Sequence, residues 1–384
     1  MNPFLGRHRW RSVVPAVAAC LALAAVAGCG GRTAKSDPAT PLPAQVTDAL
    51  TDLVGSGLPA AQAVISGPEG TRTATAGTGY VEGSHFRIGS VTKSFVATVV
   101  LQLVGEGSVE LEAPIEKYLP GVVQGNGNDG NRITVHQLLQ HTSGLADFAP
   151  EDPSEKQPQQ LDQMSDGKAY RDLGPADLVG IAMTMPPQFE PGAQFRYTNT
   201  NYVLLGMMVE RLTGRPLATE ISRRILDPLA MRDTYLPVPG ETGLREPHPT
   251  GFHKVDGTWA DITDIEAAWT GAAGAIVSTG PDLNRFTTAL ITGKLLPQAQ
   301  LDLMKNTVPM TPDGAMAYGL GLIRLQLPCQ NRTAEAWGHA GGIPGFSTLA
   351  VATPGGTAIA VSVNTEETND HFSPALTAIV CAVA

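Results

Sequence analysis

Strand-type sequence lies near both ends of this chain and is sparse between them, and this separation limits the folds available to it. Two apolar, β-branched runs flank a Pro/Gly turn near the start, and two more do so near the end, so each pair is predicted to form a β-hairpin. The four runs are Ala61–Ser66 and Thr71–Ala76, with Pro68-Glu69-Gly70 between them, and Ser347–Thr353 and Thr357–Asn364, with Pro354-Gly355-Gly356 between them.

The stretch between the hairpins has helical periodicity broken by long proline- and glycine-rich loops. Helices are predicted over Gln45–Leu53, Ser90–Glu106, Val135–His141, Ala176–Met185, Tyr202–Leu212, Pro281–Leu290 and Ser373–Val383, the last with Ser373 as N-cap. With 42% hydrophobic and 16% charged residues, the chain can bury a large core. We expect an α/β fold: an antiparallel sheet flanked by helices, built from residues 45–95 and 306–384, with an inserted, mostly helical part over about 96–305.

The N-terminal segment has the pattern of an export signal. Three arginines, Arg7, Arg9 and Arg11, precede an apolar run over Val13–Ala27. The sequence Val26-Ala27-Gly28-Cys29 resembles a bacterial lipobox, which implies cleavage before Cys29 and a diacylglycerol on that cysteine. The alternative is an ordinary secretory signal cut after Ala27. We expect a signal peptide over 1–28, a Gly/Pro-rich tether over 29–44 and an extracytoplasmic protein anchored to the cell membrane by its lipid.

The charge argues against a nucleic-acid partner. The formal charge is −10, and it becomes −13 without residues 1–28, which carry three arginines and no acid. An acidic body of this kind repels phosphate backbones.

The four cysteines have different expected roles. Cys20 lies in the discarded apolar run and Cys29 is the candidate lipid acceptor, so Cys329 and Cys381 remain in the exported body. An exported pair favours a disulfide, although two buried free thiols are the other option.

The pattern S-x-x-K occurs twice, and the two copies differ in context. Ser165-Asp166-Gly167-Lys168 lies in a polar stretch, where its lysine would be hydrated. Ser90-Val91-Thr92-Lys93 opens a buried apolar helix, so lysine and serine share one face one turn apart. A desolvated lysine at a helix start can lose its proton near neutral pH and activate the serine. The alternative is that Ser90 merely caps the helix and Lys93 is solvated.

Two further motifs carry groups with catalytic chemistry. Tyr197-Thr198-Asn199 is the only Y-x-N and is expected in a loop, where a phenol beside an ammonium can shuttle protons. His339-Ala340-Gly341 is the only H-x-G, and its glycine lets a substrate backbone approach a strand edge. Taken alone, Tyr197 fits a core aromatic, Asn199 a turn former and His339 an ordinary loop histidine.

The order of these motifs resembles that of serine β-lactamase-like, penicillin-binding enzymes, especially class C-type enzymes and DD-carboxypeptidases. Other stretches over roughly 45–384 share the family's general look: Phe86-Arg87-Ile88-Gly89, Leu138–Leu145, Ala273–Thr279 and Tyr318-Gly319-Leu320-Gly321. The resemblance implies that Ser90 is acylated, by β-lactams among others, and that Lys93 and Tyr197 transfer protons. It also implies that Asn199 binds the substrate amide and that the backbone N–H groups of Ser90 and Gly342 form an oxyanion hole.

One departure from the family pattern bears on the substrate. Many relatives have Lys-Thr-Gly where this chain has His339-Ala340-Gly341, so a permanent cation for a substrate carboxylate is missing there. The pattern is closer to DD-peptidases and esterases than to dedicated class C β-lactamases. Arg324 is a candidate replacement anchor, and a solvated strand residue is the alternative.

These features predict an enzyme that forms an acyl-enzyme on Ser90 and acts as a D-alanyl-D-alanine carboxypeptidase on peptidoglycan stem peptides. The alternatives are a carboxylesterase or weak β-lactamase with the same nucleophile, and a non-catalytic cell-envelope binding protein. No cofactor or metal is expected, because His136 and His141 are five residues apart and no H-E-x-x-H or C-x-x-C occurs. The sequence leaves the oligomeric state open.

Overall fold

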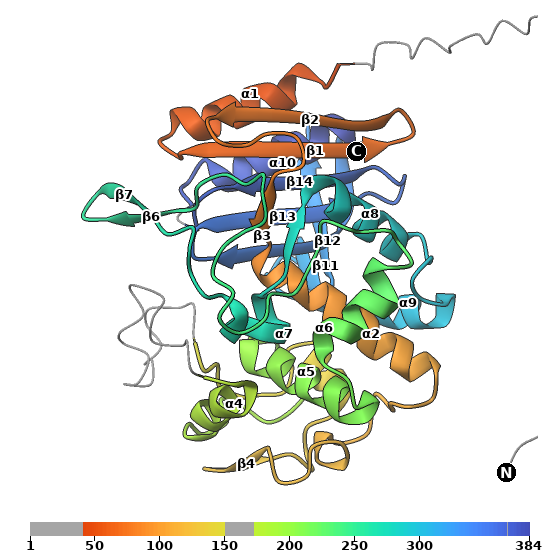
Figure 1. Cartoon of the computed structure of the whole chain (residues 1–384). Coiled ribbons are helices and arrows are strands. Elements are labelled where there is room, and N and C mark those ends of the chain that lie inside the picture. Colours follow the sequence, from red (N-terminus) through yellow and green to blue (C-terminus); the bar gives the residue numbers. More distant parts are fainter. Residues whose placement is uncertain (1–40, 150–172, 367) are drawn as a thin grey trace, which may run out of the picture. The chain divides into compact units, whose positions relative to one another are not determined.

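The computed structural model describes residues 41–149, 173–366 and 368–384 (Figure 1). The predicted signal peptide, the lipid acceptor Cys29, the tether up to residue 40 and the S-x-x-K at 165–168 lie outside these ranges. Within them, no helix combines the length and apolar character needed to span a bilayer.

An eight-stranded antiparallel sheet forms the centre of the described part, in the order β2-β1-β14-β13-β12-β11-β10-β9. Its strands are β1 (Ala60–Gly67), β2 (Gly70–Gly77), β9 (Val308–Pro309), β10 (Met316–Tyr318), β11 (Ile323–Cys329), β12 (Arg332–Ile343), β13 (Phe346–Ala352) and β14 (Ala358–Val363). Both predicted hairpins are present, and β1 pairs with β14. The expected fold class, with a sheet assembled from the two ends of the sequence, is confirmed.

Side-chain alternation along the strands makes two cores, one on each face of the sheet. In β1, Ala61, Ala63 and Ile65 belong to one core, whereas Ala60 and Val64 belong to the other. The first core is closed by α1 (Ala44–Gly55) and α10 (Phe372–Val383), which pack against each other and against the sheet. The predicted cap of α10 was wrong: His371 occupies the N-cap and Ser373 lies within the helix.

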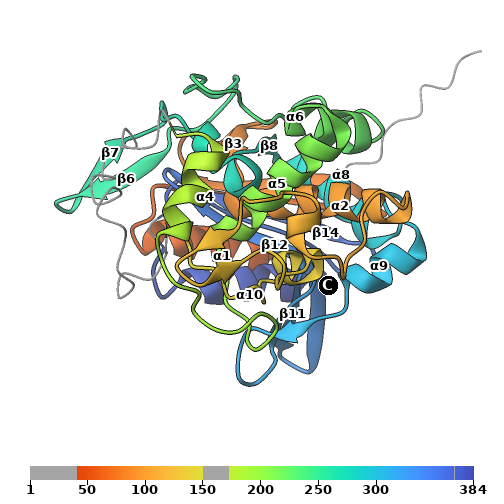
Figure 2. The same ribbon diagram turned by 90° about the horizontal axis from the view of Figure 1, so that it is seen from below.

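The opposite face is covered by helices of the middle of the chain, most of which lie below strands β11–β13 in Figure 1; Figure 2 gives the view from below. Helix α8 packs on β1, β13 and β14, and α2 packs against β12. The bounds are η1 (Gly89–Val91), α2 (Thr92–Gly105), η2 (Ile115–Lys117), α3 (Val135–Leu139), α4 (Pro175–Met183), α5 (Asn199–Thr213), α6 (Leu217–Ile221), η4 (Ser222–Leu226), η5 (Ala268–Thr270), α7 (Gly271–Gly274), α8 (Gly280–Ile291) and α9 (Gln298–Met304).

Short strand pairs also occur in the middle of the chain, where strand signals are sparse. They are β3 (His85–Arg87) with β8 (Val277–Thr279), β4 (Gln124–Gly125) with β5 (Asn128–Asp129), and β6 (Phe252–Val255) with β7 (Thr258–Asp261). Strands this short carry too little alternation to stand out in the sequence.

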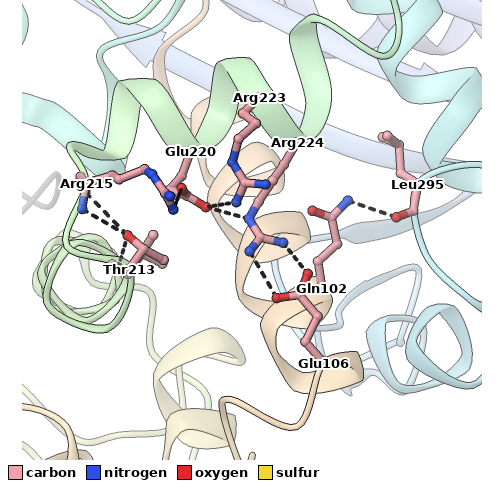
Figure 3. Close-up of polar contacts among 9 residues, drawn as sticks. Gln102, Glu106, Thr213, Arg215, Glu220, Arg223, Arg224 and Leu295 are labelled. Carbon is pink, nitrogen blue, oxygen red and sulfur yellow. Dashed lines mark hydrogen bonds and ion pairs between the residues drawn. The ribbon is translucent and has the colours of Figure 1, made fainter.

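An ion-pair cluster centred on a buried carboxylate fixes the far end of α2 (Figure 3). The carboxylate of Glu220 is fully buried and accepts hydrogen bonds from Arg224 Nε at 2.6 Å and Arg223 Nη2 at 2.9 Å. Arg224 also donates two hydrogen bonds to the carboxylate of Glu106, the C-cap residue of α2, from Nη1 at 2.6 Å and from Nη2 at 3.0 Å. The cluster therefore ties α6 and η4 to the helix that begins two residues after Ser90.

A disulfide joins Cys329 at the end of β11 to Cys381 in α10, with the Cα atoms 5.5 Å apart. The structure thus favours the disulfide over two free thiols. It attaches the last helix to the sheet across 52 residues of chain, which restricts the unfolded ensemble.

Candidate active site

Ser90 lies in a tight turn between a strand and a buried helix. β3 ends at Arg87, the single 3₁₀ turn η1 contains Ser90, and α2 begins at Thr92, two residues later than predicted. Ser90 is 9% exposed, whereas Lys93, in the first turn of α2, is fully buried. The structure therefore brings the hydroxyl to the edge of the protein interior and the amine beneath it.

The amine nitrogen of Lys93 lies close to at least three polar atoms. Its Nζ lies 2.8 Å from Ser90 Oγ, 2.8 Å from Asn199 Oδ1 and 2.8 Å from the carbonyl oxygen of Ala273 in α7. The last two atoms are acceptors only, because one is an amide oxygen and the other a backbone carbonyl. A neutral amine would keep its two N–H bonds for these two acceptors, which leaves its lone pair directed at the proton of Ser90.

Tyr197 and Asn199 come from the start of α5. That helix begins at Asn199 itself, three residues before the predicted start, and Thr198 caps it by accepting from the backbone N–H of Thr200. Tyr197 is half-buried in the preceding loop, and Lys93 Nζ lies 4.7 Å from the centre of its ring. The two motif residues therefore contact the same lysine, Asn199 from the side and Tyr197 through its ring face.

Asp147 orients Asn199, and the sequence motifs did not reveal it. Its Oδ2 accepts from the backbone N–H of Asn199 at 2.9 Å and from Asn199 Nδ2 at 3.1 Å. With the amide nitrogen turned toward Asp147, the amide oxygen faces Lys93. The only sequence signal was position, since Asp147 follows the Leu138–Leu145 stretch that supports the family resemblance.

The strand that carries the H-x-G motif lies directly against the nucleophile turn. β11 pairs with β12 only as far as Ile323–Gly338, so within the described sheet residues 339–343 of β12 pair with β13 alone. A Cβ placed on Gly341 would come within 2.1 Å of the Ile88 carbonyl oxygen and 2.8 Å of Ser90 N. A Cβ placed on Gly89, which has φ +50°, would come within 2.6 Å of Gly342 O. Only glycines allow the backbone amides of Ser90 and Gly342, the predicted oxyanion hole, to lie on neighbouring backbones.

His339 is buried at 2% exposure and both ring nitrogens have partners. Its Nε2 lies 3.0 Å from the hydroxyl of Tyr318 in β10, and its Nδ1 contacts the carbonyl oxygen of Ala340. Burial, followed by the charge of Lys93, lowers the pKa of His339 to about 3. The imidazole is therefore neutral at physiological pH.

Arg324 lies on the same face of the sheet as His339. Arg324 in β11 pairs with Trp337 in β12, and Trp337 faces the same side of the sheet as His339, two residues further along β12. Its Nη2 donates to Gly314 O at 3.4 Å, and its buried Nε has no hydrogen-bond partner among the described residues. The guanidinium is thus half-buried rather than fully solvated.

No trio of His, Cys, Asp or Glu side chains in the described ranges is placed to hold a metal ion. The chemistry that this site supports is acyl transfer: a hydroxyl nucleophile, a desolvated amine in contact with it, a phenol and an amide beside the amine, and adjacent backbone amides. This combination defines a serine hydrolase with a Ser–Lys pair.

Comparison with known proteins places the chain more closely. The sequence model of the Beta-lactamase family matches residues 46–384, so the chain belongs to that family. It is similar to the crystal structure of a D-stereospecific amidohydrolase from Streptomyces sp., with 39% identity and a TM-score of 0.82 over 90% of this chain and 100% of that one.

Two curated relatives show the range of activities found among similar chains. Esterase EstB of Burkholderia gladioli is 37% identical over 156 residues, which are 40% of this chain and 38% of the esterase. Penicillin-binding protein 4* of Bacillus subtilis (strain 168) is 25% identical over 281 residues, 70% of this chain and 58% of that protein. The chain thus spans about two fifths to three fifths of the length of these relatives. It is similar both to an esterase and to a penicillin-binding protein.

Proposed function

We propose that this protein hydrolyses an amide bond adjoining a D-amino acid through an acyl-enzyme on Ser90. The observation that carries this proposal is the contact between Lys93 Nζ and Ser90 Oγ, supported by two further contacts of the amine with atoms that can only accept a hydrogen bond. The similarity to a D-stereospecific amidohydrolase over nearly the whole chain supports the choice of substrate class.

In acylation, Ser90 Oγ attacks the scissile carbonyl carbon while its proton passes to the base. The contacts of Lys93 make it the nearest acceptor, and the ring of Tyr197 against the amine makes the phenol the alternative base or the carrier that returns the proton. The tetrahedral oxyanion is held by the N–H groups of Ser90 and Gly342. The C–N bond then breaks, and the leaving amine departs with that proton.

Deacylation reverses these roles. Water loses a proton to the same base as its oxygen attacks the ester carbon, the bond from that carbon to Ser90 Oγ breaks, and the hydroxyl regains a proton. Asn199, whose amide is fixed by Asp147, has a second N–H on Nδ2 for the carbonyl of the substrate.

The favoured substrate is a peptide that ends in D-Ala-D-Ala, which would make the enzyme a DD-carboxypeptidase. Such a peptide carries a terminal carboxylate, and the half-buried Arg324 with its unpartnered Nε is a suitable cation on the same sheet face as His339. Similarity to a penicillin-binding protein supports the same substrate and implies that β-lactams acylate Ser90.

A second candidate is a D-amino-acid amidase or esterase, and a specific observation favours it. His339 is buried and neutral where many relatives have a lysine, so the site tolerates a leaving group without a carboxylate. Similarities to the amidohydrolase and to the esterase point the same way.

The test is a parallel assay of the body from residue 45 onward as wild type, Ser90→Ala and Arg324→Gln. The substrates are a D-Ala-D-Ala peptide, D- and L-amino-acid amides, a short-chain ester and a chromogenic cephalosporin. The carboxypeptidase is established if the wild type releases D-Ala from the peptide, Ser90→Ala does not, and Arg324→Gln does so with a higher KM. Turnover of the D-amide alone, unaffected by Arg324→Gln, establishes the amidase. Turnover that survives Ser90→Ala contradicts both.

We also propose that the enzyme is exported and held at the cell membrane by a lipid on Cys29. The arginines, the apolar run and the lipobox-like Val26-Ala27-Gly28-Cys29 support this location, and peptidoglycan lies in that compartment. Detergent phase separation of the full chain and of Cys29→Ser tests it. A wild-type protein that remains in the aqueous phase would contradict the proposal.

A further inference from the structure

Three buried side chains form a continuous hydrogen-bonded series beneath the active site. His141 lies just after α3, Tyr318 in β10 and His339 in β12, and each is at most 2% exposed. The hydroxyl of Tyr318 lies 3.2 Å from His141 Nε2 and 3.0 Å from His339 Nε2. Residues 141, 318 and 339 are thus joined through one hydroxyl, although they are 177 and 21 residues apart in sequence.

The two ends of this series fix where the protons are. At one end, His141 Nδ1 lies 3.3 Å from the backbone N of Thr198 and 3.3 Å from Asn201 Nδ2. A backbone N–H can only donate, and Asn201 presents its amide nitrogen because its Oδ1 accepts from Ser143. His141 Nδ1 is therefore an unprotonated acceptor. At the other end, His339 Nδ1 contacts the carbonyl oxygen of Ala340, which can only accept, so this Nδ1 carries a proton.

The protons between the ends follow from these two constraints. A neutral His141 with a bare Nδ1 has its proton on Nε2 and donates it to Tyr318. A neutral His339 with a protonated Nδ1 has a bare Nε2, which accepts the hydroxyl proton of Tyr318. The hydroxyl of Tyr202 also lies near that proton and donates its own proton to Leu139 O at 3.0 Å, but an imidazole nitrogen is a stronger acceptor than a phenol oxygen. Neutrality of both rings agrees with their burial, which, together with the charge of Lys93, lowers the pKa of His141 well below its usual range and that of His339 to about 3.

We propose that His141 and Tyr318 are positioning residues, which hold His339 as a neutral Nδ1–H tautomer in a one-directional series of hydrogen bonds from Thr198 N–H to Ala340 O. Both ends adjoin the catalytic groups. Thr198 separates Tyr197 from Asn199, and Ala340 precedes the glycines that lie against Ser90. The series therefore sets the distance between the start of α5 and the β12 edge.

A consequence for specificity follows, and it depends on the proposed function. The Nε2 lone pair of His339, which lies in the plane of the ring, accepts the proton of Tyr318. The single N–H of the ring, on Nδ1, is donated to the carbonyl oxygen of Ala340. His339 therefore has no hydrogen to offer a substrate carboxylate, and recognition of such a group falls to Arg324.

The direct test is nitrogen-15 NMR of the imidazoles in the intact body from residue 45 onward. We expect His141 as the Nε2–H tautomer and His339 as the Nδ1–H tautomer between pH 5.5 and 8, without titration. Observation of the opposite tautomer for either residue, or of a protonated His339 at pH 6, overturns the inference. This measurement needs no substrate, so its result is independent of whether the proposed activity is found.

The functional test removes the central hydroxyl. Tyr318→Phe should lower the rate of acylation of Ser90 by at least about tenfold, because displaced catalytic groups lose their alignment. It should also release His339 from the single tautomer in the NMR spectrum. Tyr80→Phe is the matched control, since the Tyr80 hydroxyl is also buried and bonded, at 2.8 Å to Ser362. Acylation of Tyr318→Phe at the rate of the control would overturn the positioning role.

A second pair of variants guards against simple misfolding. His141→Gln retains one acceptor and one donor, whereas His141→Leu retains neither. We expect the glutamine variant to acylate at least about fivefold faster than the leucine variant at equal thermal stability, in keeping with retained hydrogen bonding. Equal rates for the two variants would contradict the inference.

Discussion

At the scale of single residues, the site is organised around one amine whose neighbours are almost all fixed. Lys93 faces a nucleophile, an amide oxygen and a backbone carbonyl, so its protonation state decides the direction of proton flow. This arrangement explains why a lysine, and not merely a cation, occupies the position.

Lys93→Arg is the sharpest test of that role. Arginine keeps the positive charge and can donate to Asn199 Oδ1 and Ala273 O, but it does not lose its proton near neutral pH. We therefore expect the second-order rate of acylation by a penicillin or an activated ester to fall by about 10³-fold or more. Mass spectrometry of the adduct on Ser90 over time measures this rate. Acylation within tenfold of wild type would show that the amine is not the base.

Asp147 should matter for catalysis although it touches neither Ser90 nor Lys93 in the contacts described above. Asp147→Ala frees Asn199 Nδ2, so the amide can rotate away from Lys93, and we expect kcat to fall by about 10- to 100-fold. Asp129→Ala is a matched control, because the half-buried Asp129 accepts from the backbone N–H and Nδ2 of Asn131 in the same way. Equal kcat in the two variants would contradict the role of Asp147.

At the scale of elements, a buried arginine holds the strand that leads into the nucleophile turn. Arg87 in β3 is 2% exposed and donates to the carbonyl oxygens of Thr263, Thr242 and Ile265 at 2.6–2.9 Å. Burial, the dominant effect, lowers its pKa to about 10, so it remains charged at neutral pH. β3 is only three residues long, and this side chain adds three long-range hydrogen bonds to the pairing of β3 with β8.

Arg87→Met should lower the free energy of unfolding by about 3–5 kcal/mol, because three buried carbonyl groups lose their donors. Urea unfolding followed by circular dichroism measures the loss. Arg211→Met, at an exposed position on α5, is the comparison and should change stability by less than about 0.5 kcal/mol. A similar small change for Arg87→Met would mean that water replaces the guanidinium at little cost.

The elements that the sequence predicted well are those with local signals, such as turn residues or a regular spacing of apolar residues. The two hairpins are built around Pro/Gly turns, α2 is an apolar helix and α8 is an amphipathic one, so their positions follow from turn chemistry and periodicity. The start of α5 was placed too late because Asn199 looked like a loop residue, and its helical cap depends on Thr198. Short strands such as β3 are set by distant partners, which no local pattern encodes.

The same division applies to the site. Ser90, Lys93, Tyr197 and Asn199 lie in recognisable motifs, and the structure brings all four together. Asp147, His141 and Tyr318 were not assigned roles, because their importance comes from contacts across 21 to 177 residues of chain. Long-range hydrogen bonds leave no periodic trace in a single sequence.

At the scale of the whole molecule, neutral buried histidines couple folding to pH. The pKa values of His141 and His339 are lowered in the folded protein, mainly by burial. Below about pH 6.5 the unfolded chain binds protons at these rings and the folded protein does not. Their contribution to stability is thus present above that pH and is lost as the pH falls toward the folded pKa.

The free energy of unfolding should therefore decrease between pH 6.5 and pH 5 by about 1.4 kcal/mol per pH unit for each of the two imidazoles. Urea unfolding at pH 7.5, 6.5, 5.8 and 5 measures the slope, and this range lies above the main titration of surface carboxylates. His339→Asn should make the slope shallower. A stability that is unchanged from pH 7.5 to pH 5 would refute this coupling.

The direct backbone contact between the nucleophile turn and β12 has a consequence for how such enzymes diversify. Where Gly341 and Gly89 meet, there is no side chain to enlarge, shrink or recharge, and any substitution collides with the opposing main chain. Amino-acid substitutions that change the preferred substrate but keep the reaction are therefore expected in the surrounding loops. A library of variants intended to change substrate preference should keep residues 88–93 and 339–342 constant and randomise other positions around the site.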